Sequence, residues 1–313
     1  MSEKYIDFLG YKYIAITFSV LLVAFSVYQW IATGSSKYGI DFVGGTEVVA
    51  RFGQASSVKE LSNIVEQAGL KEVAVQSFEF GSNEFSVRAG EQAGLDHKAL
   101  ADKITNALKS AFPGKVSPGK VSPDKVEILK VDSVGATISD EVKKSALIAV
   151  SIGILGLLVY IAFRFEIAFG LGAVVAVFHD VIISLGIYLA LGHEINGSVI
   201  AAALTILGYS VNDTIVVFDR VREEMRKRKT DNLSDLMNQA MNFCLSRTII
   251  TSGLTLFSAL ALLVLGGGAI KDLSLFLVVG IIVGSYSTIF IASPVVLAWE
   301  SWRNRSGRSV SKK

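Results

Sequence analysis

Six apolar segments, each about twenty residues long, constrain the fold of this chain more than any other feature. A helix needs about 20 apolar residues to cross the hydrocarbon core of a bilayer. Only helices and closed barrels cross it, because every backbone polar group must be paired inside the protein. The chain is therefore predicted to be a membrane α-helical protein with six transmembrane helices. The apolar segments lie near 13–32, 144–163, 167–191, 198–218, 248–265 and 273–299.

Composition agrees with a membrane protein and excludes several other classes. Hydrophobic residues make up 51% of the 313 residues, and the net charge is only +2, so nothing favours nucleic acid as a partner. Cys244 is the single cysteine, which excludes an internal disulfide, and we interpret it as a small buried apolar residue. Because Asp7 interrupts the leader and the first apolar run is too long for a signal-peptide core, we expect a retained transmembrane helix there.

The distribution of basic residues predicts the orientation of the spans. Six spans place both termini on the same side, and loops rich in Lys and Arg favour the cytoplasm. Basic residues cluster on one side of the predicted topology, at Lys4, Lys12, Arg164, the run 220–229 and the tail 300–313, whereas the short loops opposite hold only His193, Glu194 and Lys271. Both termini are therefore expected in the cytoplasm.

One large hydrophilic insertion, at 33–140, is predicted to be a folded domain outside the cytoplasm. Strands are expected at 47–52, 73–80, 84–89 and 126–131, and helices after the N-cap residues Ser57 and Asp96. The resulting order βαββαβ is that of a ferredoxin-like α+β domain. We interpret residues 81–83 as a hairpin turn, and a direct repeat of Gly-Lys-Val-Ser-Pro at 114–123 as a duplicated surface loop.

The predicted organisation of the chain follows from these boundaries. It consists of a cytoplasmic N-terminus (1–12), the first transmembrane helix (13–32), the exported domain (33–140), helices two to four (141–219), a cytoplasmic segment (220–247), helices five and six (248–299) and a basic cytoplasmic tail (300–313). The basic residues of the cytoplasmic segment are expected to enforce topology or to contact anionic headgroups of the lipid bilayer. A docking surface for a cytoplasmic partner is the alternative.

No pattern typical of an enzyme is present. The sequence lacks the Gly-x-x-x-x-Gly-Lys-Ser/Thr loop that binds nucleotide phosphates, and its three histidines and one cysteine do not have the spacing of a metal site. We therefore expect neither catalysis nor a bound cofactor. If the protein performs work, the energy must come from a source other than a nucleotide on this chain.

Polar residues inside the predicted spans are the strongest functional lead. Asp213 lies in an apolar stretch, where a carboxylate costs about 2.5–3.5 kcal/mol on insertion scales and usually has a function. Polar residues line one face of its span (Thr205, Tyr209, Asn212, Asp213), and Arg247, Thr251, Thr255 and Ser258 form a stripe on the next. Two facing stripes would pair Asp213 with Arg247 beside hydroxyls that relay protons. The alternative is hydrogen bonding that only holds the helices together.

His179 and Asp180 lie near the middle of the third predicted span. A histidine titrates near neutral pH, and a neighbouring carboxylate influences that titration. The pair is therefore interpreted either as a second proton site or as a buried structural pair, and the sequence does not decide between them.

Three motifs follow one another along the chain. They are Gly-Ile-Asp-Phe-Val-Gly-Gly-Thr at 39–46, Val-Asn-Asp-Thr-Ile-Val-Val-Phe-Asp-Arg at 211–220, and Ser-Arg-Thr at 246–248. Together they resemble the SecF members of the bacterial SecD/SecF family of protein-export membrane proteins, and the resemblance covers nearly the whole chain. Besides the intramembrane pair, the motif residues that carry the resemblance are Asp41, Gly44, Gly45, Asp219 and Arg220.

The resemblance implies half of a transporter of the resistance–nodulation–division (RND) superfamily, located in the bacterial cytoplasmic (inner) membrane. It implies SecD as the partner, a connection to the SecYEG translocon, YajC and the SecA pathway, and unfolded preproteins as substrates. In this family the protonmotive force is taken to drive late-stage export, and the intramembrane aspartate and arginine correspond to Asp213 and Arg247. The proton is the expected coupling ion, with Na⁺ as the alternative.

Two other functions stay open on the sequence alone. An RND-type half-transporter for small molecules would need a partner half as well, and a passive scaffold that stabilises the translocon would not depend on Asp213. Proton movement supplies enough free energy for such coupling, because one charge crossing the membrane yields about 2.3 kcal/mol per 100 mV. Shifting a two-state domain takes about 5.5 kcal/mol, so a few protons per cycle would suffice.

Overall fold

The computed structural model describes residues 6–53, 57–70, 73–78, 83–90, 95–112, 126–228, 232–266 and 269–305. The chain divides into two compact units. The membrane unit comprises Met1–Ile31, Val150–Ile187 and Ala201–Lys313. The second unit comprises Ala32–Ala149 and Tyr188–Ile200, and we call it the exported unit after the location that the sequence predicts for it. The exported unit thus includes the connection between the third and fourth spans as well as the hydrophilic insertion.

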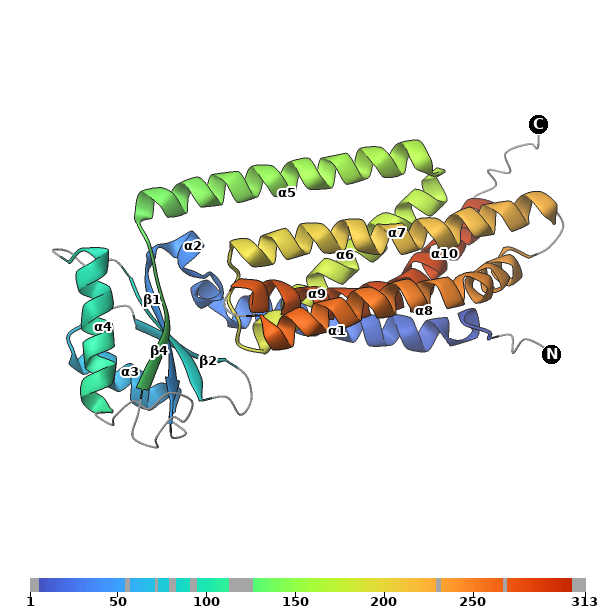
Figure 1. Cartoon of the computed structure of the whole chain (residues 1–313). Helices are drawn as coiled ribbons and strands as arrows, with labels where there is room; N and C mark the ends of the chain where they lie inside the picture. The colour runs from blue at the N-terminus through green and yellow to red at the C-terminus, as the bar shows by residue number, and fades with distance from the viewer. Residues whose placement is uncertain are drawn as a thin grey trace. The chain divides into compact units, whose positions relative to one another are not determined.

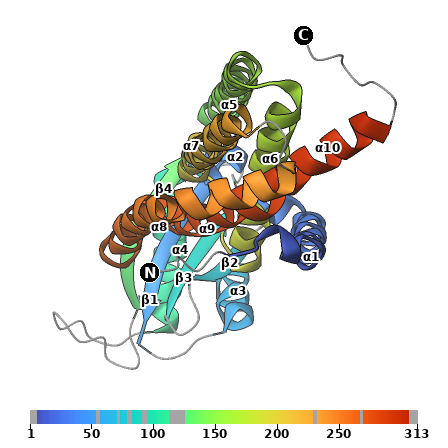
Figure 2. The same cartoon turned by 90° about the vertical axis from the view of Figure 1, so that its right-hand side faces the viewer.

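Among the residues that the structure describes, six helices are long and apolar enough to cross a membrane, as the hydropathy pattern predicts. They are α1 (Lys12–Ala32), α5 (Ala136–Arg164), α6 (Ile167–Ala190), α7 (Gly197–Lys227), α8 (Leu233–Leu265) and a last span built from α9 (Ala269–Ser287), a π-helical turn (Thr288–Ala292) and α10 (Ser293–Arg305). The start of α1 and the end of α10 lie at the same end of the membrane unit (Figure 1), the end that faces the viewer in Figure 2. This arrangement is the one that an even number of spans requires.

Several helices extend beyond the apolar segments that marked them in the sequence. α5 begins at Ala136, α7 continues through the basic run to Lys227, and α8 begins at Leu233. Most of the segment 220–247, expected as a separate cytoplasmic piece, therefore belongs to two long helices. Residues 219–228 are mostly arginine and glutamate and contain no Gly or Pro, so the helix continues beyond the apolar segment.

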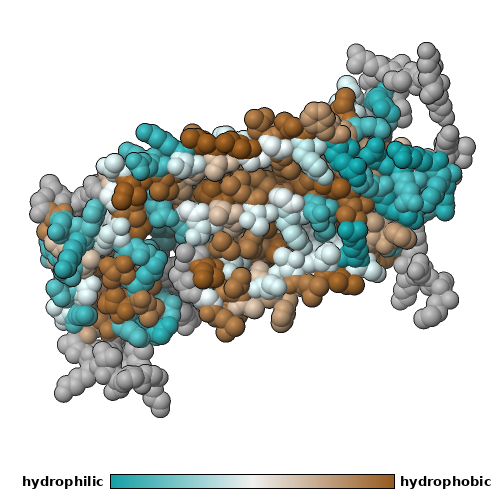
Figure 3. Space-filling view, turned by 45° about the horizontal axis from the view of Figure 1, so that its top comes forward, coloured by the Kyte–Doolittle hydropathy of each residue, from teal (hydrophilic) through white to brown (hydrophobic). Residues whose placement is uncertain are grey.

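Apolar side chains both fill the membrane unit and cover its sides. A core of buried residues lies between the helices and includes Phe218, Met237 and Ala292. Many large apolar side chains stay exposed along the spans, for example Phe163 on α5 at 89%. Figure 3 shows many brown, hydrophobic residues along the middle of the view and teal, hydrophilic residues gathered toward both of its ends. Such a surface is suited to lipid or to a membrane partner rather than to water.

Helix α9 packs closely against α7 because of two glycines. A Cβ on Gly280 would lie 2.5 Å from the side chain of Ile206, and one on Gly284 would lie 3.3 Å from Ser210. Small residues allow two membrane helices to approach each other. The polar residues of α7 and α9 can therefore come within hydrogen-bond distance.

The exported domain has the predicted βαββαβ order. Its elements are β1 (Gly45–Phe52), α3 (Val58–Gln67), β2 (Val73–Phe78), β3 (Glu84–Ala89), α4 (His97–Ala111) and β4 (Val126–Val134), preceded by the short helix α2 (Ile40–Val43). The antiparallel sheet has the strand order β2-β3-β1-β4, so β1 and β3 form its centre. The side chains of Ser57 and Asp96 accept hydrogen bonds from backbone amides of α3 and α4, as expected for N-caps.

One face of the sheet forms the core of this domain. Val48, Ala50 and Phe52 alternate along β1 and are buried, together with apolar residues of the two helices: Leu61, Val65, Leu100, Ile104 and Leu108. The period-two pattern in the sequence thus identified the buried face correctly. Most of the expected hairpin turn (residues 81–82) and the repeat at 114–123 lie outside the described residues.

Two exposed positions provide a test of the six-span topology. Lys98 lies in the exported domain and Arg226 near the end of α7, and three predicted spans separate them along the chain. We expect a membrane-impermeant maleimide to label Lys98→Cys in spheroplasts and Arg226→Cys only after the membrane is opened. The buried Cys244 is replaced by alanine in both variants. Labelling of both cysteines from the same side would contradict the topology.

Candidate functional site

Asp213 on α7 lies inside the membrane unit. Its side chain is 5% exposed, and Ser252 Oγ on α8 donates a hydrogen bond to Asp213 Oδ2 at 3.2 Å. Ser252 is itself buried. Within the described part of the chain, no lysine or arginine forms an ion pair with this carboxylate. A hydroxyl on the neighbouring helix is thus its direct partner.

Arg247 does not form the ion pair with Asp213 that the spacing predicted. Its side chain is exposed, as are those of Thr251, Thr255 and Ser258. The three hydroxyls donate to backbone carbonyls of their own helix, at 2.9–3.0 Å. The inward face of α8 carries Thr248 and Ser252 instead. The two polar stripes are offset by one residue along the helix, so spacing alone could not show which of them faces α7.

The other polar residues that were expected beside Asp213 differ in their exposure. Asn212 is exposed, although it precedes the buried Asp213 directly. Thr205 is exposed too, and its hydroxyl donates to the carbonyl of Ala201. The hydroxyl of Tyr209 is buried and has no hydrogen-bond partner among the described residues. A continuous line of hydroxyls beside Asp213, as expected from the sequence, is therefore not formed within the described part of this chain.

A second carboxylate, Asp180 on α6, is fully buried where three helices meet. Its Oδ2 accepts hydrogen bonds from Ser210 on α7 at 2.5 Å and from Ser287 on α9 at 2.7 Å. Its Oδ1 lies 2.9 Å from Nδ1 of His179. The sequence identified His179 and Asp180 but not the two serines, because these lie 30 and 107 residues away from Asp180 and join it only through helix packing.

Further polar contacts extend from the Asp180 cluster. The hydroxyls of Thr214 and Thr288 lie 3.1 Å apart, and Thr288 begins the π-helical turn, a feature frequent at functional sites. The ring of His179 stacks on Tyr286, whose hydroxyl donates to the carbonyl of Ala15 on α1 at 2.8 Å. His179 Nε2 is buried without a hydrogen-bond partner among the described residues. The cluster thus connects α6, α7 and α9 and reaches α1.

The partners of the two carboxylates define what the site can do chemically. A hydroxyl can both donate and accept, and a protonated carboxyl group can donate as well. A carboxylate held by hydroxyls can therefore gain or lose a proton without breaking an ion pair. A carboxylate locked to a buried arginine could not do so without leaving an uncompensated charge. The geometry at Asp213 fits proton exchange better than a permanent ion pair.

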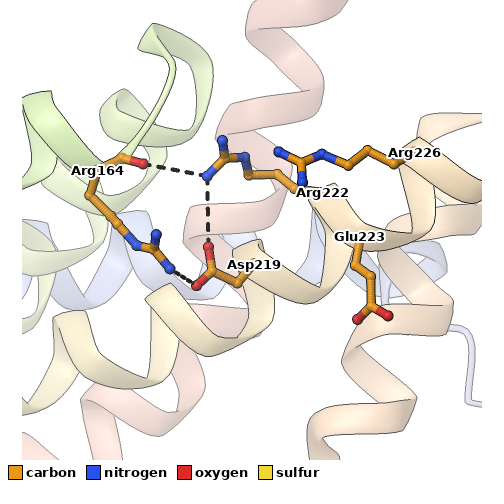
Figure 4. A pocket seen from close by; sticks show the side chains of 5 residues that line it. All are labelled: Arg164, Asp219, Arg222, Glu223 and Arg226. Carbon is orange, nitrogen blue, oxygen red and sulfur yellow. Dashed lines mark hydrogen bonds and ion pairs between the residues drawn. The ribbon is translucent and has the colours of Figure 1, made fainter.

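Ion pairs hold the end of α7, where Asp219 and Arg220 of the second motif lie. Asp219 pairs with Arg164 at the end of α5, and Arg222 Nη1 donates to the Arg164 carbonyl at 3.4 Å. Figure 4 shows these side chains, which line a cavity of about 290 Å³ with Glu223 and Arg226. Arg220 pairs with Glu224 at 2.7 Å, and its guanidinium lies 3.7 Å from the centre of the Phe243 ring on α8. These residues attach α7 to α5 and α8.

The first motif lies in the exported unit. Asp41 Oδ2 accepts a hydrogen bond from the backbone amide of Gly197 at 2.8 Å, and Gly44 and Gly45 both have positive φ. Asp41 therefore lies at the start of α7, whereas Gly45 lies against Ala89 of β3. Among the described residues, no group of three or more His, Cys, Asp and Glu side chains could hold a metal ion.

Two family descriptions match the chain. Residues 116–302 match "Protein export membrane protein SecD/SecF, C-terminal", and residues 37–56 match "SecD/SecF GG Motif". The protein is 40% identical to "Protein translocase subunit SecF" of Thermodesulfovibrio yellowstonii over 302 residues, which cover 95% of each chain. It is 38% identical to the protein of the same name from Rickettsia rickettsii over 291 residues, which cover 93% of this chain and 90% of the relative.

A solved structure is similar over nearly the whole chain. The crystal structure of SecDF, a translocon-associated membrane protein from Thermus thermophilus, matches with a TM-score of 0.78 and 36% identity over 96% of this chain. The match covers 39% of the SecDF chain. The chain described here thus spans well under half the length of that polypeptide.

The Asp180 cluster predicts a specific loss of stability. Asp180→Ala would remove the buried carboxylate that Ser210 and His179 contact, and each polar group left unsatisfied costs about 1–3 kcal/mol. Ser287 would lose the same acceptor and keep only its hydrogen bond to the Gly284 carbonyl. We expect a clear fall in the melting temperature of the purified full-length protein in detergent, measured by the temperature at which it aggregates. The matched variant Asn212→Ala, at an exposed position of α7, should change the melting temperature little. Equal effects of the two variants would contradict the structural importance of the cluster.

Proposed function

Because the chain belongs to the SecD/SecF family of protein-export membrane proteins, we propose that it is the SecF subunit of a Sec accessory complex driven by the protonmotive force. In this proposal it promotes the late stage of preprotein export across the cytoplasmic membrane. The observation that carries the proposal is the burial of Asp213 inside the helices, with a hydroxyl as its direct partner. The relatives are named as protein translocase subunits, and in this proposal the chain supplies an energy-coupling site rather than a catalytic one.

Each polar residue receives a role in the proposed cycle. Asp213 takes up a proton from one side of the membrane and releases it to the other, and Ser252 orients its carboxyl group in both states. Asn212, exposed beside it, is the entry position for water or for a group of the partner. Asp180, with His179 and Ser210, is a second proton-binding position on the same helix bundle. Proton is the coupling ion in this scheme, and Na⁺ is the alternative that the experiment below separates.

The exposed stripe of α8 supports a partner within the membrane. Arg247, Thr251 and Thr255 lie in a helix of membrane-spanning length and face outward. An arginine that faces lipid at this depth is costly. We therefore propose that the membrane half of SecD covers this stripe. Arg247 then lies at the interface between the two proteins, beside the proton path. The greater length of the SecDF polypeptide agrees with a second half of similar size.

The remaining partners follow from family membership alone. They are the SecYEG translocon, YajC, the SecA pathway and unfolded preproteins. The proposed location is the bacterial inner membrane with both termini in the cytoplasm, in agreement with the shared end of α1 and α10 and with the basic residues near it.

A vesicle assay tests the proposed function. Inverted membrane vesicles contain the translocase and the full-length chain with SecD, and translocation is measured as preprotein that becomes protected from protease. We expect Asp213→Asn to abolish the increase in translocation that an imposed proton gradient produces, because asparagine keeps the shape of the side chain but cannot exchange a proton. Separate proton and sodium gradients identify the coupling ion.

The control for this assay is Asp235→Asn, which removes an exposed carboxylate near the start of α8. It should leave the stimulation unchanged. Undiminished stimulation in assembled Asp213→Asn complexes would support the passive scaffold and end the proton-driven proposal.

Crosslinking tests the proposed position of SecD. A single cysteine at Thr255, on the exposed stripe of α8, should crosslink to SecD with a short bifunctional reagent in native membranes, whereas Ile14→Cys on the exposed apolar face of α1 should not. The reason is that Thr255 lies on the polar stripe and Ile14 on a surface that lipid can cover. Products at Ile14 and none at Thr255 would place the partner elsewhere.

A further inference from the structure

The segment after the first span is fixed tightly against the sheet of the exported unit. Gly44 and Gly45 have φ of +80° and +115°, values that residues with a side chain rarely adopt. A Cβ on Gly45 would lie only 2.4 Å from the carbonyl oxygen of Ala89 on β3. The backbone between α2 and β1 is therefore tightly packed, and α2 has a defined position relative to the sheet.

The same segment binds the connection between α6 and α7. The amide of Ile195 donates to the carbonyl of Lys37 at 2.7 Å, and the amide of Gly39 donates to the carbonyl of Ile195 at 2.9 Å. These two bonds form a parallel bridge between Tyr38 and Ile195. The backbone that leads into α7 is thus paired with the backbone that leads into β1.

Asp41 makes the contact with α7 itself. Its carboxylate accepts the hydrogen bond from the amide of Gly197, the first residue of that helix. The first amides of a helix have no acceptor within the helix, and a negative charge is favourable at this end of the helix dipole. Asp41 therefore stabilises the first turn of α7 from a position on α2.

Arg88 adds an ion pair from the sheet. It lies on β3, its guanidinium pairs with Glu194 in the α6–α7 connection, and its Nη1 also donates to the carbonyl of Tyr38 at 2.5 Å. The side chains of Arg88 and Glu194 are only 10% and 15% exposed. Loss of either side chain would break this largely buried ion pair, and breaking a buried ion pair by removing one partner is costly. Asp41, Arg88 and Glu194 form what we call the α7 joint.

We propose that the α7 joint couples the exported domain to the helix that carries Asp213, with Asp41 and Arg88 as positioning residues for the energy-coupling reaction. α7 runs without interruption from Gly197 to Lys227. Asp213 lies about 24 Å along the helix from its first residue, at 1.5 Å per residue. A shift or rotation of α7 at Asp213 reaches the joint because the helix has no proline to absorb it. The joint then transmits this movement to β3 and β1.

The inference rests on the proposed function, since it takes Asp213 as the place where proton movement acts on α7. Its test uses the full-length chain with SecD in the vesicle assay, with translocation expressed per assembled complex. Asp41→Ala and Arg88→Met are expected to lower the gradient-dependent part of translocation about fivefold or more, the range of typical coupling energies. Translocation driven by ATP alone should stay unchanged.

Two matched variants separate coupling from a general loss of structure. Asp41→Asn keeps an oxygen that can accept from Gly197, and asparagine is a good N-cap residue, so it should retain most of the stimulation. Arg51→Met removes an exposed arginine of β1 that pairs with Glu84 and Glu127 at the surface. It should have no effect, because exposed ion pairs contribute little.

A reversible crosslink makes the test independent of the stability of the variants. Tyr38→Cys and Ile195→Cys, with Cys244→Ala, place two cysteines across the backbone bridge, a separation that a disulfide can span. In the Asp41→Ala background, oxidation should restore the gradient-dependent stimulation and reduction should remove it again.

The outcomes separate failure of the α7 joint from failure of the proposed proton-driven function. If Asp213→Asn keeps full stimulation, the proposed function fails. If Asp213→Asn abolishes stimulation while Asp41→Ala and Arg88→Met keep it in assembled complexes, only the joint is rejected. A disulfide that forms but does not restore stimulation also rejects the joint.

Discussion

Hydrocarbon offers no hydrogen-bond partner, and this constraint governs how the membrane helices pack around two carboxylates. Asp180 is satisfied because α6, α7 and α9 meet where Ser210 and Ser287 can donate to it. Asp213 is satisfied by Ser252 of α8. Serine hydroxyls thus join the helices at both of these carboxylates. A proton that binds to either carboxyl group changes which hydrogen bonds it can make, so the contacts that fix the packing are also sensitive to the ion.

Helix α7 brings the three functional regions of the chain together. It begins at Gly197, where Asp41 accepts the hydrogen bond from its first amide, and it carries Asp213 within the bilayer. Its far end is attached to α5 through the ion pair of Asp219 with Arg164. A helix that is held at both ends by charged contacts and contains no proline is expected to move as one body. In the proposed function, this property lets a proton at Asp213 act on the domain that faces the exported chain.

Sequence patterns predicted the fold well because periodicity and hydropathy are local properties. The six spans, the βαββαβ order and the buried face of Val48, Ala50 and Phe52 all depend on residues close together in the chain. The polar site was predicted only in part. Asp213 and Asp180 were identified because a carboxylate in an apolar run is unusual, but their partners are set by helix rotation. Helix α8 carries two neighbouring polar stripes. The spacing predicted that the outward stripe with Arg247 pairs with Asp213, whereas the actual partner, Ser252, lies on the inward stripe. The Arg88–Glu194 pair joins residues 106 positions apart and left no local signal.

Infrared difference spectroscopy of the full-length chain with its partner tests the central claim most directly. The claim is that the carboxyl group of Asp213 binds and releases a proton within the membrane. The account predicts a carbonyl band of a protonated carboxyl group that appears as the pH is lowered, disappears as it is raised, and is missing from the Asp213→Asn spectrum. A spectrum that is the same for the native protein and Asp213→Asn at every pH would contradict the claim, because the carboxyl group would then not exchange a proton.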